Sequence, residues 1–139
     1  MTGRTDDIVE IGQLLARYGV TITQGDIDGL IEVFTPDGSY SAFGDTYPLA
    51  EFPGLVAAAP KGLFLTGPPA IEFTGEDSAA GTQPLCFIEQ ATHDMRIGYY
   101  NDTYRRTGAG WRLCTRAMTF IRRSGEHNSG IPHAYKGTA

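Results

Sequence analysis

Cysteine and histidine are scarce in this sequence. Only two of its 139 residues are cysteines, Cys86 and Cys114, and both lie in apolar, strand-like segments. Two thiols are too few for the disulfide framework of a small secreted domain, so we expect free thiols in a reducing compartment, the cytoplasm. The three histidines, His93, His127 and His133, are scattered. Because a zinc site needs several ligands at close spacing, the sequence predicts no metal site.

Basic charge and long apolar segments are also lacking. The chain has 11 Lys and Arg residues against 16 Asp and Glu residues, a net charge of −5. Nucleic acid is not an expected partner, because its phosphates require a clear surplus of basic residues. No segment approaches the roughly 20 apolar residues of a membrane span, and no apolar run follows basic residues near the N-terminus. We therefore expect no membrane association.

Helical periodicity characterises the beginning of the chain, and strand periodicity its second half. Thr5 can cap a first helix, in which apolar residues recur at helical spacing, and Asp26 can cap a second, shorter one. The expected elements are helices over 5–24 and 27–34, a strand over 39–43, one or two helical turns around 49–59, and strands over 63–74, 82–92, 95–107 and 110–123.

This order of elements predicts an α+β domain. Consecutive strands joined by short turns pair antiparallel, and helices followed by such a meander give a curved antiparallel sheet wrapped around the N-terminal helices. We expect one domain over residues 1–123. Residues 124–139 are rich in Gly, Ser, His and Pro, a composition that predicts a flexible C-terminal tail.

The most informative segment is 98–116. Alternation from Tyr100 to Tyr104, turn residues at 107–110 and renewed alternation predict a long β-hairpin with one apolar, aromatic face. Arg116 follows on that face, which is also expected to hold Cys114, Met118 and Phe120. A guanidinium keeps its proton at neutral pH, so an inward-facing one must meet an anion, a ligand or water.

Three motifs occur in order along the chain. An opening pair of helices ends in Phe34 and the acidic turn 36–38, a G-x-Y-x-D strand begins at Gly98, and a G-W-R-x-x-x-R strand begins at Gly110. Together they resemble the SnoaL-like branch of the nuclear-transport-factor-2-like (NTF2-like) superfamily. The motifs cover about half of the chain, and residues 44–95 match the family poorly.

The resemblance implies a cone-shaped α+β fold with a deep apolar pocket, commonly a homodimer through the sheet. Relatives include ketosteroid isomerases, scytalone dehydratase, polyketide cyclases, a hexachlorocyclohexane dehydrochlorinase and limonene epoxide hydrolase. Others bind a ligand or a partner without catalysis. Since one fold hosts several functions, the site must be argued residue by residue.

Several dehydratase-like relatives use an Asp at the end of the first helix together with a His on a later strand. The resemblance places Thr23 at the Asp position and Thr66 or Gly67 at the His position, and none of these residues ionises. Asp26 is the nearest carboxylate, and its position is better explained by helix capping than by a role as a pocket acid. An Asp–His dyad is therefore not expected.

The resemblance makes Arg116 a pocket residue that stabilises developing negative charge, with Tyr100 as a stacking and proton-donating partner. The alternatives are a salt bridge from Arg116 to Asp102 or Glu89 within the sheet and a core role for Tyr100. His93, beside Asp94, is a candidate general base if its turn covers the pocket mouth, and otherwise a surface residue. Candidate catalytic residues are Arg116, Tyr100, His93 and Asp102. Candidate substrate-binding residues are Tyr18, Tyr40, Phe34, Thr66, Met118 and Phe120.

The leading hypothesis is a cofactor-independent enzyme that acts on a small hydrophobic, oxygenated molecule of polyketide, terpenoid or steroid type. Its reaction would be a cyclisation, isomerisation or dehydration by general acid–base catalysis. A non-catalytic ligand-binding or dimerisation module is the alternative, favoured by the missing dyad. Epoxide hydrolysis is a weaker alternative, because it would require Arg116 to lie between two pocket carboxylates.

Overall fold

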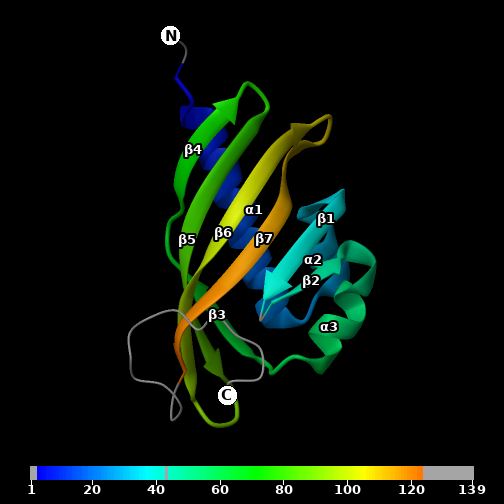
Figure 1. The fold of residues 1–139 in the computed structure, drawn as a ribbon, viewed down its shortest axis with the longest axis vertical. Coiled ribbons are helices and arrows are strands. Elements are labelled where there is room, and N and C mark those ends of the chain that lie inside the picture. Colours follow the sequence, from blue (N-terminus) through cyan, green and yellow to red (C-terminus); the bar gives the residue numbers. More distant parts are fainter. Residues whose placement is uncertain (1–2, 43, 124–139) are drawn as a thin grey trace.

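The computed structural model describes residues 3–42 and 44–123, and it forms an α+β fold in which helices precede most of the sheet (Figure 1). The tail expected over 124–139 lies outside the described residues. The elements are α1 (Thr5–Gln24), α2 (Ile27–Glu32), β1 (Phe34–Ala42), β2 (Asp45–Pro48), a 3₁₀ turn η1 (Leu49–Glu51), α3 (Phe52–Ala58), β3 (Gly62–Thr66), β4 (Ala70–Gly75), β5 (Ser78–Glu89), β6 (Met95–Thr107) and β7 (Gly110–Arg123).

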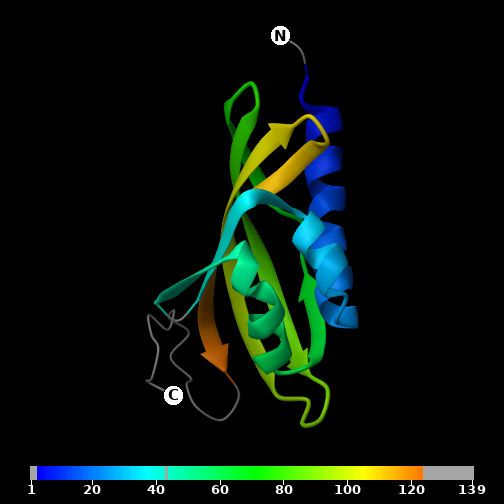
Figure 2. The same ribbon diagram turned by 90° about the vertical axis from the view of Figure 1, so that its right-hand side faces the viewer.

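The strands form one curved, unclosed sheet in the order β2-β1-β7-β6-β5-β3, and β4 also pairs with β5. The meander β5–β6–β7 is antiparallel, as expected, whereas β1 runs parallel to β7. Figure 2 shows α1, α2 and α3 on the same side of the sheet. The expected α+β class and curved sheet are therefore confirmed. None of the helices in the described ranges has both the length and the apolar character needed to cross a membrane.

The structure corrects several expected boundaries. The strand expected over 63–74 is two strands, β3 and β4, because Pro68 and Pro69 have no amide hydrogen with which to continue the ladder. The first strand begins at Phe34, five residues earlier than expected. Thr5 is the first residue of α1 and does not cap it, because Arg4 occupies the N-cap position. Asp26 does cap α2, and its Oδ1 accepts from the Gly29 amide at 3.0 Å.

A β-bulge determines which residues of β7 face the helices. Thr103 pairs with Thr115 but Tyr104 pairs with Leu113, so Cys114 is an extra residue that shifts the alternation. As a result Leu113 and Arg116, three residues apart, are both fully buried. Cys114 is only half-buried and does not share the inner row of Arg116 as the alternation alone predicted.

Candidate functional site

A cavity of about 270 Å³ lies between the inner face of the sheet and the three helices. Its volume is close to the lower end, roughly 300 Å³, of pockets that hold drug-sized ligands, so it suits a mono- or bicyclic molecule. Every helix and most strands contribute to its wall. The lining residues include Ile22, Leu30, Phe52, Leu55, Val56, Phe64, Leu85, Phe87, Met118 and Phe120. The apolar pocket implied by the resemblance is therefore present.

Tyr18, Tyr40 and Tyr100 supply polar groups to this apolar wall. They come from α1, β1 and β6, so distant parts of the chain bring these three phenols together, and Tyr47 of β2 adds a fourth tyrosine to the wall. Burial raises the pKa of the Tyr18, Tyr40 and Tyr100 phenols above their usual value of about 10, which keeps all three protonated at physiological pH. A protonated phenol donates a hydrogen bond, and these residues can therefore bind an acceptor oxygen of a ligand.

Arg116 lies directly behind two of these tyrosines. Its guanidinium carbon is 3.7 Å from the centre of the Tyr100 ring and 4.4 Å from that of Tyr18. The two rings meet edge to face, with their centres 5.7 Å apart. Arg116 is fully buried and does not line the cavity itself, so its charge acts on a ligand through the phenols.

The anion that Arg116 meets is Asp102. The Arg116 Nε donates to Asp102 Oδ1 at 2.8 Å and Nη2 donates to Oδ2 at 2.9 Å, while Nη2 also donates to Gln83 Oε1 at 2.6 Å. Burial alone would lower the pKa of the guanidinium, but the Asp102 charge and hydrogen bonds outweigh it and raise the pKa. Of the two salt bridges considered from the sequence, Arg116 forms the one to Asp102 and not the one to Glu89.

The remaining candidate residues lie outside the cavity wall. His93 is an exposed turn residue with a φ of 63°, and its turn does not contribute to the wall. Phe34 is buried behind the wall and packs edge to face on Tyr18 and Phe52. Thr66 lies beside a separate shallow groove at the β3–β5 edge. The structure thus brings Tyr18, Tyr40, Tyr100, Met118 and Phe120 together, and leaves His93, Phe34 and Thr66 outside.

The position expected for a dehydratase Asp does belong to the cavity. Thr23 lines it, and its hydroxyl oxygen accepts from the Phe64 amide at 3.0 Å. Among the described lining residues there is no Asp, Glu or His. Nor do the described residues contain a group of three or more His, Cys, Asp or Glu side chains that could hold a metal ion.

Two cationic lining residues, Arg96 and Lys61, were not among the candidates from the sequence. Strand alternation could have indicated Arg96, because this residue precedes Tyr100 by four positions on the same strand and therefore lies on the same face of the sheet. Lys61 follows α3 in a segment that the sequence motifs do not cover, and no sequence signal indicated it.

Comparisons with known proteins agree with this architecture. A SnoaL-like domain model matches residues 3–117. An uncharacterized protein of Mycobacterium tuberculosis is 29% identical over 81% of this chain and 84% of its own length.

Two solved structures from Novosphingobium aromaticivorans have the same fold. One, an NTF2-like protein with a cystatin-like fold, is 26% identical with a TM-score of 0.76, covering 87% of this chain and 86% of its own. The other, provisionally named a scytalone dehydratase, has a TM-score of 0.80 at 14% identity and covers 98% and 97% of the two chains. With the matching domain model, the helices packed on a curved sheet and the apolar cavity between them, the chain belongs to the SnoaL-like family of the NTF2-like superfamily.

Proposed function

We propose that this protein binds a small hydrophobic molecule with a carbonyl group and promotes its cyclisation by polarising that carbonyl. The observation that carries the proposal is the set of phenols from Tyr18, Tyr40 and Tyr100, the first and last fully buried, in a mostly apolar cavity wall. Tyr18 and Tyr100 are backed by the Arg116 charge. An oxygen that gains negative charge in the transition state would accept from these donors.

The donor-rich wall favours cyclisation over dehydration. In a ring closure, a carbon–carbon bond forms between the substrate's enol carbon and the polarised carbonyl carbon, whose C=O π bond breaks. The carbonyl oxygen takes up the negative charge and then a proton, and the enol hydroxyl loses its proton and becomes a carbonyl. Holding the two reacting carbons together can by itself supply about 7–11 kcal/mol of the barrier. Dehydration by an Asp–His pair has no support here, because Thr23 occupies the place of the acid and Thr66 lies outside the wall.

The replacement Tyr100→Phe tests the proposal, because it removes one hydroxyl and keeps the ring that stacks on Arg116. A suitable substrate is an aryl-substituted 1,5-diketone, whose aldol ring closure is followed by liquid chromatography. Loss of one such donor typically lowers kcat by about 10²-fold or more. Tyr99→Phe is the matched control, since Tyr99 is the neighbouring residue on the opposite face of β6. Equal rates in wild type and Tyr100→Phe would contradict the assignment.

A ligand-binding protein without turnover is the second candidate. It is favoured by the lack of a carboxylate or imidazole among the described lining residues. In that case no diketone would react, yet 1-tetralone would bind more tightly than tetralin, which has no carbonyl, and Tyr100→Phe would reduce that difference. Calorimetric titration with the two compounds distinguishes this outcome from a cavity that binds by apolar contact alone.

We further propose a homodimer formed through the outer face of the sheet, and a cytoplasmic location. Exposed apolar residues gather on that face, namely Leu63 and Leu65 on β3 and Met95 and Ile97 on β6, and they support the proposed interface. The free thiols of Cys86 and Cys114 are consistent with a reducing compartment.

A further inference from the structure

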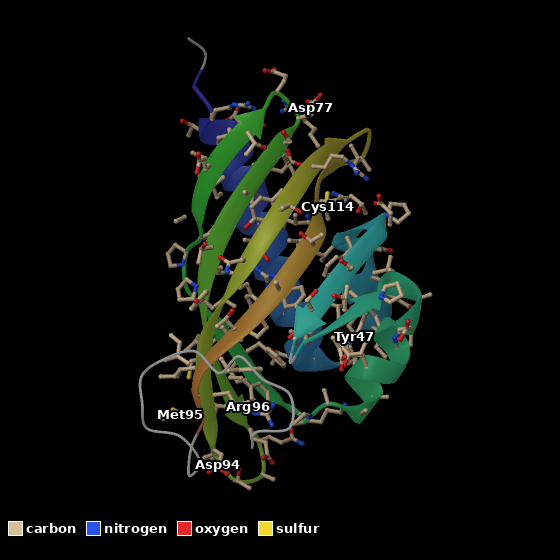
Figure 3. All side chains as sticks on the ribbon, viewed as in Figure 1. Tyr47, Asp77, Asp94, Met95, Arg96 and Cys114 are labelled. Atoms are coloured by element: carbon tan, nitrogen blue, oxygen red, sulfur yellow. The ribbon has the colours of Figure 1, made fainter. Side chains whose placement is uncertain are left out.

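The cavity wall contains a fourth phenol, Tyr47, which is not part of the donor set described above. Tyr47 lies on β2 and is the direct cross-strand partner of Tyr40 on β1. Residues opposite each other in an antiparallel pair project from the same face, so the two rings lie next to each other on the cavity side of the sheet. Figure 3 shows Tyr47 in the part of the molecule formed by β1, β2 and α3, far from the β6–β7 turn.

The group beside the Tyr47 hydroxyl is a carboxylate. This hydroxyl donates to Asp45 Oδ2 at 3.4 Å. Asp45 precedes Tyr47 by two positions on β2, so strand alternation places both side chains on the same face, and both are half-buried. A distance of 3.4 Å is long between two oxygens, but hydrogen bonds in unliganded sites commonly shorten when a ligand binds.

Tyr18 and Tyr100 have the opposite charge beside them. The Arg116 guanidinium lies over both rings, and it has no acceptor, so it takes up neither hydroxyl proton and this pair can donate to a ligand. Tyr47, by contrast, has a single proton and directs it to Asp45. An ionised carboxylate only accepts hydrogen bonds, so the lone pairs of the Tyr47 oxygen are left to a ligand. The cavity therefore has a donating side at Tyr18 and Tyr100 and an accepting side at Tyr47.

Tyr40 lies between these two sides. Burial is the main cause of its raised pKa, and the phenols of Tyr18 and Tyr47 both add to the rise. Since both phenols influence the same hydroxyl, the donating and accepting sides belong to a single space. That space has a volume of about 270 Å³, so one mono- or bicyclic molecule can contact both sides at once.

We propose that the ligand of this cavity carries a hydroxyl group, enolic or phenolic, that donates to the Tyr47 oxygen. Tyr47 is then the residue that selects this group, and Asp45 is a positioning residue that acts through Tyr47. The binding of a carbonyl at Tyr18 and Tyr100 rests on the function proposed above, whereas the binding of the hydroxyl depends only on Tyr47 and Asp45. In the proposed ring closure the hydroxyl is that of the attacking enol, so the substrate class is an enolised, hydrophobic diketone.

Four probes separate the two sides of the cavity. They are 5-hydroxy-1-tetralone, 5,6,7,8-tetrahydro-1-naphthol, which lacks the carbonyl, and the methyl ethers of both, titrated calorimetrically into the protein. A methyl ether can accept a hydrogen bond but cannot donate one. The ratio of its dissociation constant to that of the parent hydroxyl compound therefore measures donation by the ligand. We expect a ratio of about three to ten, because one hydrogen bond is lost in the ether.

Two variants test the assignment to Tyr47. Tyr47→Phe should lower the ratio to about one and leave the affinity for the ethers unchanged, because it keeps the ring and removes the acceptor. Asp45→Ala should lower the ratio as well, since the released Tyr47 proton can then bind the ether oxygen. The matched controls are Tyr99→Phe, on the outer face of β6, and Glu51→Ala, which removes an exposed carboxylate of η1, and both should keep the wild-type ratio. Circular dichroism checks that each variant is folded.

Equal affinity of the hydroxyl compounds and their ethers for the wild type overturns the inference, as does an unchanged ratio in Tyr47→Phe or in folded Asp45→Ala. If Asp45→Ala does not fold, Tyr47→Phe decides alone. A preference for the ketones over the probes without a carbonyl, without a preference for the hydroxyl compounds, contradicts this inference and supports the proposed function. The reverse pattern supports this inference and contradicts the proposed function. No measurable binding of any probe contradicts both.

Discussion

Arg116 illustrates how much one residue depends on its partners. Removing a charged side chain from water costs several kcal/mol, and here that cost is offset by Asp102, Gln83 and two tyrosine rings. The Asp102 carboxylate also accepts from the Tyr104 hydroxyl at 2.9 Å. The buried pair therefore belongs to a network that fixes the rings of Tyr18 and Tyr100 from behind.

Breaking this pair should destabilise the protein strongly and non-additively. We expect Arg116→Met and Asp102→Leu each to lower the free energy of unfolding by about 3–5 kcal/mol, because each leaves an uncompensated buried charge. The double variant should lose clearly less than the sum of the two, since no buried charge remains. Urea denaturation of the wild type, the two single variants and the double variant gives this double-mutant cycle. Losses in the free energy of unfolding that simply add would contradict a direct interaction between Arg116 and Asp102.

On the scale of the elements, the first turn of α1 is attached to the β6–β7 hairpin. The Asp7 carboxylate accepts from Arg4 at 2.9 Å, from Arg106 at 2.8 Å and from the Trp111 indole at 3.1 Å. These donors, the Arg4 hydrogen bond first and the Trp111 hydrogen bond next, lower the pKa of Asp7 below its usual value of 3.8. One carboxylate thus joins residues more than 90 positions apart in the sequence.

This attachment should make stability depend on pH. Because the pKa of Asp7 is lower in the folded than in the unfolded protein, its contribution is complete above about pH 4 and is lost as the pH falls through the lowered pKa. Asp7→Asn should therefore be less stable than wild type at pH 7, with a difference that shrinks toward pH 2. Urea midpoints measured from pH 7 to pH 2 check this, with exposed Asp6→Asn as the control. A constant difference across that range would exclude the linkage.

The β6–β7 ladder also depends on a glycine. Ile97 pairs with Arg122 but Gly98 pairs with Phe120, so Ile121 forms a second bulge in β7. A Cβ at Gly98 would collide with the nearby Thr119 carbonyl. We expect Gly98→Ala to cost about 1–3 kcal/mol of stability, as overpacking does. Gly12→Ala is the control, because nothing lies within 4 Å of its Cβ in the middle of α1, and it should stabilise the protein by about 0.5–1 kcal/mol. Equal melting temperatures for wild type and Gly98→Ala would contradict the collision.

On the scale of the whole molecule, the face of the sheet opposite the cavity is apolar at one end. Leu63 and Leu65 on β3, and Met95 and Ile97 on β6, are exposed there. The register places Ile88 and Cys86 of β5 between them, so the residues form a contiguous patch. Patches of this kind commonly mark interaction surfaces, and this one supports the proposed homodimer.

Charge introduced into the patch should therefore disrupt the dimer. We expect the wild type to have the mass of two chains in light scattering after size exclusion, and the double variant Leu65→Lys/Ile97→Lys that of one, because the interface would bury unpaired ammonium groups. Val20→Lys, on an exposed position of α1, should keep the dimer mass. A monomeric wild type at micromolar concentration would contradict the proposal.

The sequence by itself determined the fold class, the hairpin and the inward row from Tyr100 to Tyr104, because periodicity and turn residues are local signals. It also identified Arg116 as an inward cation and Thr23 at the end of the first helix. Only the tertiary structure decided that Arg116 pairs with Asp102 behind the tyrosines, and that Arg96 shares the cavity with Lys61 while His93 stays outside. Such outcomes depend on register, on the bulge at Cys114 and on which distant elements pack together, and no local pattern encodes these.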